Sequence, residues 1–128
     1  MEKEEILEIY DKKEEIDKIV ERLKKFRFED FIKTDHFYYS LEEKNTDINF
    51  IKDNFEKFNL ISLVNKRKHK NEKISYDFYY ELEDGTYILY AIALDEEKPV
   101  LFNAFHVIRN FKQFRKNLIK AYKDKLIG

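Results

Sequence analysis

Residues 74–94, ISYDFYYELEDGTYILYAIAL, decide the fold because they contain two strand patterns joined by an Asp-Gly pair. Residues 74–82 alternate between an apolar face and a face of polar side chains and Tyr79. Residues 86–94 are apolar on both faces, which is typical of a strand in the middle of a sheet. The pair Asp84-Gly85 predicts a two-residue hairpin turn between the two strands.

The segments that flank this hairpin widen the predicted sheet. LISLV at residues 60–64 and VLFNAFHVI at residues 100–108 both have strand character. Short polar connections join each of them to the hairpin, so the chain order gives a meander of four antiparallel strands. Helical patterns precede and follow this meander, and the sequence therefore predicts an α+β fold with N-terminal helices and a C-terminal helix.

Apolar residues at helical spacing predict a long amphipathic helix within residues 1–27. Ile9, Ile16 and Leu23 fall at heptad spacing, so this helix either forms a homodimer through residues 2–26 or packs on its own domain. Three points are fewer than a sustained heptad repeat needs, which favours packing within the domain. A second helix is expected after a cap at Asn45 or Thr46, and the last helix is expected after a cap at Asn110.

Length and composition limit the class of protein. The 128 residues correspond to a single domain, residues 1–128. The 25 basic and 26 acidic residues nearly cancel, so an anion site must be local. The absence of cysteine excludes disulfides and thiolate chemistry. No apolar run of membrane-spanning length and no signal-peptide pattern is present, so we expect a cytoplasmic protein that does not enter a membrane.

The predicted hairpin brings two titratable side chains into one row of the sheet. A two-residue turn would set Glu81 opposite Ile88, and Ile88 would lie opposite His106 on the next strand. Glu81 and His106 would then be about 10 Å apart at the backbone, a gap that could hold a phosphodiester between an acid and a base. A register shift of one residue would move His106 to the other face.

The stretch NKRKHKNEK at residues 65–73 is the strongest local concentration of positive charge. A run of this kind binds successive phosphates without reading bases, and the candidate phosphate-binding residues are Lys66, Arg67, Lys68, His69 and Lys70. Tyr79 and Tyr90 are candidates for stacking on single-stranded bases. The alternative is that the stretch is only a solvated hairpin tip. No histidines or carboxylates have a metal-ligand spacing, so we expect neither a metal site nor a cofactor.

A short motif supports the assignment to RNA chemistry. TDHFYYSLEEKNTDINFI at residues 34–51 resembles the opening motif of small domains related to the barnase, colicin and RelE-type superfamily of RNase toxins. In that group basic residues often follow the first histidine after four and eight positions; here His36 and Lys44 match, and Ser40 replaces the other basic residue. The resemblance implies an antiparallel sheet that presents a metal-independent catalytic site to RNA, and a small antitoxin-like protein partner.

Three functions follow from these patterns. The first is a metal-independent endoribonuclease or toxin-like RNA-binding protein, in which His36 or His106 acts as acid or base while Lys44 and Arg67 bind the phosphate. The second is a non-catalytic interaction or oligomerisation module of the same fold. The third is a pocket for a small ligand lined by aromatic residues, which no polar pattern supports.

Overall fold

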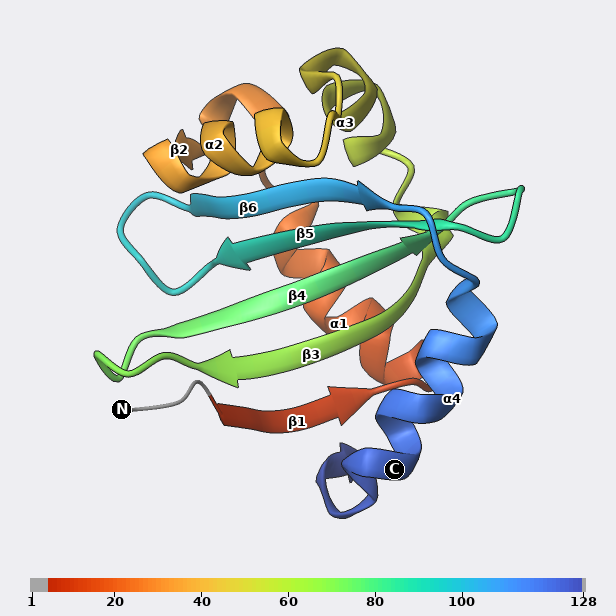
Figure 1. Cartoon of the computed structure of the whole chain (residues 1–128). Helices are drawn as coiled ribbons and strands as arrows, with labels where there is room; N and C mark the ends of the chain where they lie inside the picture. The colour runs from red at the N-terminus through yellow and green to blue at the C-terminus, as the bar shows by residue number, and fades with distance from the viewer. Residues whose placement is uncertain (1–4, 128) are drawn as a thin grey trace.

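The computed structural model describes residues 5–127 and has an α+β architecture built on one sheet (Figure 1). Its strands are β1 (Glu5–Tyr10), β2 (Ile32–Lys33), β3 (Ile61–Lys68), β4 (Ile74–Glu81), β5 (Tyr87–Ala93), β6 (Val100–Val107) and β7 (Leu126–Ile127). Its α-helices are α1 (Lys13–Leu23), α2 (Asp35–Glu43), α3 (Ile48–Phe55) and α4 (Phe111–Ala121). Three short 3-10 turns lie at Phe28–Asp30, Phe58–Leu60 and Lys123–Lys125.

The sheet has seven strands in the order β2-β6-β5-β4-β3-β1-β7. The predicted four-stranded antiparallel meander, β3 to β6, forms its centre. β1 extends the sheet beside β3 in antiparallel orientation, and the two-residue strands β2 and β7 pair in parallel at the edges. The prediction of an α+β fold is confirmed, but four strands understate the sheet because the edge strands were not recognised.

The predicted helix at the N-terminus is wrong over its first part. Residues 5–10 form β1, and the helix starts only at Lys13. The sequence EILEIY has no strict period, and Ile9 is buried opposite Asn65 of β3, so pairing with the sheet overrides the helical pattern. Residues 1–4 lie outside the described residues.

This change of structure also removes the predicted dimer seam. Ile9, Ile16 and Leu23 are all buried within the chain, with Ile9 on a strand and the other two on α1. The continuous helix that the dimer alternative requires is therefore not present. Packing on the domain, the alternative interpretation, is the one found for α1.

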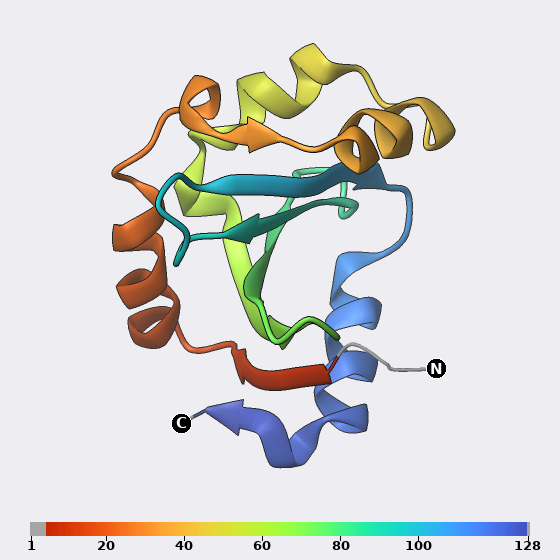
Figure 2. The ribbon, with the colours of Figure 1, turned by 90° about the vertical axis from the view of Figure 1, so that its left-hand side faces the viewer.

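Helices cover the two faces of the sheet unequally (Figure 2). On one face, α1, α2 and α3 form the main core with alternate residues of the meander, including Tyr76, Phe78 and Tyr80. α4 packs on the opposite face through Phe111, Phe114 and Leu118 against Tyr79 and Tyr87. The alternation predicted for residues 74–82 is confirmed by this division of the core.

The hairpin turn after β4 is one residue longer than predicted. The Leu82 amide donates to the Thr86 carbonyl (2.9 Å), the Gly85 amide donates to the Leu82 carbonyl (3.0 Å), and Gly85 has a φ of 88°. This is a three-residue loop in which only glycine takes the left-handed conformation. Glu81 consequently lies opposite Tyr87, and Tyr80 lies opposite Ile88, so the predicted pairing of Glu81 with Ile88 is wrong.

Side-chain caps set the start of three helices. The side-chain oxygens of Thr34, Asp47 and Asn110 accept from backbone amides at the starts of α2, α3 and α4. The predicted cap at Asn110 is confirmed, whereas the cap of α3 is Asp47 and not Asn45 or Thr46. Asn45 instead has a positive φ of 51° just after α2, which ends that helix.

Replacing Tyr80 with phenylalanine tests how the sheet holds α3. The buried Tyr80 hydroxyl donates to the Phe55 carbonyl at 2.7 Å, and Phe55 ends α3, where carbonyls lack partners within the helix. We expect Tyr80→Phe to lower the free energy of unfolding by about 1–3 kcal/mol, because a buried acceptor loses its donor. Tyr39→Phe, at an exposed position, should leave the urea midpoint nearly unchanged.

Candidate functional site

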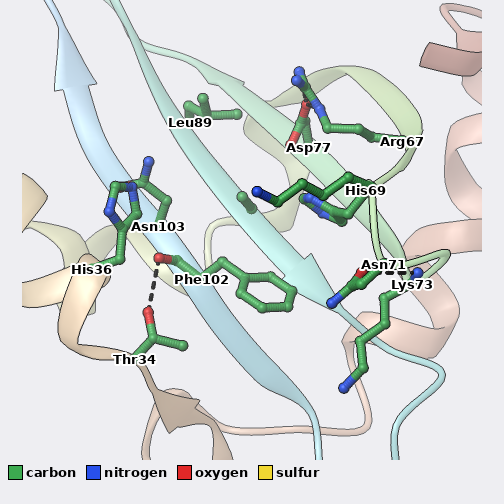
Figure 3. Close-up of a pocket in the computed structure, with 12 residues that line it drawn as sticks. Thr34, His36, Arg67, His69, Asn71, Lys73, Asp77, Leu89, Phe102 and Asn103 are labelled. Atoms are coloured by element: carbon green, nitrogen blue, oxygen red, sulfur yellow. Dashed lines mark hydrogen bonds and ion pairs between the residues drawn. The ribbon is translucent and has the colours of Figure 1, made fainter. Parts of the chain in front are cut away.

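A pocket of about 750 Å³ opens on the face of the sheet that carries α4, beyond the area that α4 covers. Its charged and imidazole side chains come from two separate parts of the chain: α2, which supplies His36, and the β3–β4 hairpin, which supplies Arg67 from β3, Asp77 from β4 and further residues from the loop between them. That loop supplies His69, Lys70 and Lys73. Figure 3 shows His36 on one side of the pocket and the Arg67–Asp77 pair on the other, with β5 and β6 between them.

A cross-strand row of short side chains crosses the sheet beneath this pocket. Asn65, Asp77, Ala91 and Asn103 are successive partners across β3, β4, β5 and β6. Because they are direct partners, their side chains lie on the same face. The small side chain of Ala91 leaves space above the middle of the row, between the polar side chains of Asp77 and Asn103.

The Asp77–Arg67 ion pair holds one wall of the pocket. Arg67 donates from Nε (2.9 Å) and from a terminal nitrogen (2.6 Å) to the same Asp77 carboxylate oxygen. The Asp77 side chain is only 3% exposed and the Arg67 side chain 27%, so the acid is buried and the guanidinium reaches the pocket. A buried carboxylate needs such a partner, which fixes the position of the Arg67 cation.

His69 lies just after the end of β3, where the chain turns toward β4. Its backbone amide donates to the Lys73 carbonyl (2.8 Å), and its Nε2 lies 2.7 Å from the Ser75 hydroxyl. Its ring lies 5.5 Å from the ring of Phe102 on β6. The residue expected from sequence to bind phosphate is thus half-buried and oriented by three contacts.

His36 is placed in the pocket by the way α2 lies along β6. Thr34, the cap of α2, donates from its hydroxyl to the Phe102 carbonyl at 3.1 Å and so ties the start of the helix to the strand (Figure 3). His36 follows in the first turn of α2 and is exposed to solvent. Its Nε2 lies 3.4 Å from the Ser40 hydroxyl, one helical turn further along.

The predicted basic cluster divides between the pocket and the surrounding surface. Arg67, His69 and Lys70 line the pocket, whereas Lys66 and Lys68 are not among its lining residues. Lys66 pairs with Glu8 (3.6 Å) and Lys68 with Glu72 (3.1 Å). Within residues 5–127, Lys70 has no ion-pair partner, so its ammonium group is available to an anion in the pocket.

His106 lies on the other face of the sheet and does not join His36. It is opposite Ile88, as predicted, but its ring packs on Phe50 of α3 (5.2 Å) and its Nε2 bonds to the Thr86 hydroxyl (2.8 Å). Glu81 points to the opposite face and lies 3.4 Å from the Ser62 hydroxyl. The predicted row of Glu81 and His106 is therefore wrong, because the longer turn shifts β4 by one residue.

Thr86 links His106 to the hairpin turn. Its hydroxyl donates to the Asp84 carboxylate, and its backbone amide donates to the same oxygen at 2.9 Å. These hydrogen bonds lower the pKa of Asp84 below its ordinary value, with a smaller contribution from the nearby His106. The chain Asp84–Thr86–His106 therefore stabilises the turn at the end of the sheet away from the pocket.

Three other predicted residues also lie outside the pocket. Lys44 is the C-cap of α2 and places its ammonium group 5.5 Å from the centre of the Phe105 ring. Tyr79 and Tyr90 are 4% and 0% exposed, and burial raises the pKa of both phenols above the ordinary value. Because their ring faces are packed in the core, the prediction that bases stack on Tyr79 and Tyr90 is corrected.

Phe102, Asn103 and Asp77 were not predicted as site residues. A β-bulge in β6 explains the first two: Ala91 pairs with Asn103 and Ile92 with Leu101, so Phe102 is an extra residue. Both Phe102 and Asn103 line the pocket as a result. The sequence does offer an indication for Asp77: it is the only carboxylate within residues 74–80 of a predicted strand, and a carboxylate that is buried in a sheet needs a charged or hydrogen-bonding partner.

Comparison of the chain with protein-family models, curated proteins and solved structures gave no match. Over residues 5–127, no group of three histidine, aspartate or glutamate side chains is arranged to hold a metal ion. The helices in this part of the chain are all too short or too polar to cross a membrane. The function must therefore be inferred from the geometry of the pocket.

Proposed function

We propose that the protein binds the backbone of single-stranded RNA in this pocket and cleaves it as a metal-independent endoribonuclease. One observation carries the proposal: His36 and His69, from distant segments, line the same pocket as Arg67 and Lys70. Imidazole is the side chain whose ordinary pKa suits proton transfer near neutral pH. A site with two imidazoles and two cations therefore has the groups that phosphodiester cleavage requires.

The two histidines divide the proton transfers between them. One imidazole accepts the proton of the ribose 2′-hydroxyl as its oxygen forms a bond to phosphorus. The other donates a proton to the 5′-oxygen as the bond between that oxygen and phosphorus breaks. The products are a 2′,3′-cyclic phosphate and a free 5′-hydroxyl, so neither water nor a redox partner is consumed.

The cations stabilise the charge that develops on phosphorus. Arg67 is held by Asp77, so its guanidinium is already in place when substrate binds. Lys70 is exposed in the same pocket and contributes a second positive charge. The net charge of the whole chain is −1, so any attraction to RNA must come from the local cations of the pocket. Because such binding depends on contacts with phosphates, added salt should weaken it.

A small protein partner of the antitoxin type would act by covering the pocket. Tyr38 and Tyr39 of α2 are 50% and 62% exposed, beside the helix face that carries His36. Large exposed rings of this kind are typical of protein interfaces. The non-catalytic interaction module therefore stays the second candidate function, and these two tyrosines are the observation that favours it.

Incubation of the full chain with a 5′-labelled single-stranded RNA separates the two functions. We expect cleavage that persists in excess chelator and yields a 2′,3′-cyclic phosphate end, which acid converts to a 2′- or 3′-phosphate. The matching DNA should stay intact, because it lacks the attacking 2′-hydroxyl. An intact RNA under all conditions, free or ribosome-bound, would favour the interaction module.

A further inference from the structure

The β-bulge in β6 brings two neighbouring side chains, Phe102 and Asn103, into the pocket. In a regular strand Phe102 and Asn103 would point to opposite faces. Because Phe102 is the extra residue of the bulge, both side chains line the pocket, while Leu101 and Ala104 on either side are buried in the main core. Bulges are a known means of redirecting a side chain beside a functional site.

The ring of Phe102 is only partly buried, in contrast to Tyr79 and Tyr90. The centre of this ring lies 5.5 Å from that of the His69 ring, at an angle of 47° between the planes. Figure 3 shows the Phe102 ring extending across the pocket between His36 and the loop that carries Asn71. A partly exposed aromatic ring that lines the same pocket as Arg67 and Lys70 is suited to stacking on a base.

Asn103 adds a polar group next to this ring. Its side-chain oxygen has no hydrogen-bond partner among the described residues, although it is buried. A buried acceptor without a donor is unusual in a native protein. The amino group of a base is a donor of the kind that asparagine side chains bind.

We propose that Phe102 is the platform on which one base of the bound RNA stacks, with Asn103 beside it to bind the edge of that base. This inference rests on the proposed function and deepens it: the substrate is a nucleotide with an unstacked base, not any phosphodiester. Paired RNA keeps its bases stacked inside the helix, so the site selects single strands, loops and ends. The positions that sequence patterns suggested for stacking, Tyr79 and Tyr90, are replaced by one partly exposed ring, Phe102.

Titration of the full chain with two small probes, followed by NMR chemical shifts, tests the platform. The probes are adenosine 5′-monophosphate and ribose 5-phosphate, which share the sugar and the phosphate and differ by the base. We expect wild type to bind the nucleotide about tenfold more tightly. Phe102→Leu should remove this gain and leave the affinity for ribose 5-phosphate unchanged.

Two further variants complete the test. Phe102→Tyr keeps an aromatic ring and should keep the gain, which guards against a loss caused by misfolding of Phe102→Leu. Phe105→Leu changes a ring on the same strand that does not line the pocket, and it should also keep the gain.

Each possible result decides one of the two proposals. If both probes bind equally to wild type through Arg67 and Lys70, the platform is wrong and the proposed function stands. If Phe102→Leu keeps the full gain, the base binds elsewhere and the inference is overturned. If neither probe binds to wild type, both the platform and the phosphate site are wrong.

Discussion

His36→Ala and His69→Ala should each slow RNA cleavage by about 10²–10⁴-fold, because each removes one of the two proton-transfer groups. The change should appear in single-turnover rates measured with saturating RNA, while the affinity for RNA changes much less. Neither side chain belongs to a hydrophobic core, so both variants should fold, although His69→Ala should be less stable because the buried Ser75 hydroxyl loses its hydrogen-bond partner. The rates are therefore compared at a temperature where urea denaturation shows both variants to be folded. The double variant should lose little more than either single variant, since the two groups act in one reaction.

His106→Ala is the matched control for this prediction. It removes the same type of side chain from β6, on the opposite face of the sheet and outside the pocket. We expect its cleavage rate to stay within about threefold of wild type, because it touches no part of the reaction. An equal loss of activity in His106→Ala would contradict the assignment of the site to this pocket.

The meander could be predicted because its pattern is local. The alternation in residues 74–82 and the cap at Asn110 depend on neighbours in sequence, and both recur in the structure. The turn at Gly85 also recurs, with one residue more than predicted. β1 could not be predicted, because EILEIY becomes a strand only when it pairs with β3 and buries Ile9. A strand that forms only through pairing with a distant strand need not show an alternating pattern in its own six residues.

The pocket depends on strand register, which is set by turn length and bulges that the residue pattern does not specify. Arg67 and His69 were recognised as phosphate-binding candidates and His36 as a catalytic candidate, because their residue types indicate that chemistry. Their convergence could not be derived, since it requires α2 to lie along β6. One extra residue in the turn was enough to separate Glu81 from the row of His106, and one bulge in β6 was enough to admit Phe102 to the pocket.

Asp77 is the buried partner of the Asp77–Arg67 ion pair. Both the stability of the protein and the position of the Arg67 cation in the pocket therefore depend on Asp77. Removing one partner of a buried ion pair leaves an uncompensated charge and costs about 3–5 kcal/mol, although the partly exposed Arg67 can recover some hydration. We therefore expect Asp77→Ala to lower the free energy of unfolding by about 2 kcal/mol, measured by urea denaturation. Arg67 would also lose its fixed position. The folded variant should therefore bind phosphate less tightly than wild type when both are measured at a urea concentration at which the variant is still folded.

Asp95→Ala is the control that separates burial from charge. Asp95 also pairs with an arginine, Arg22, but the two side chains are 53% and 40% exposed. An exposed pair contributes about 0–1 kcal/mol, so this variant should unfold close to the wild-type midpoint and bind phosphate normally. If Asp77→Ala were equally mild, Arg67 would not depend on Asp77 for its position, and preorganisation of the Arg67 cation would have to be dropped from the mechanism.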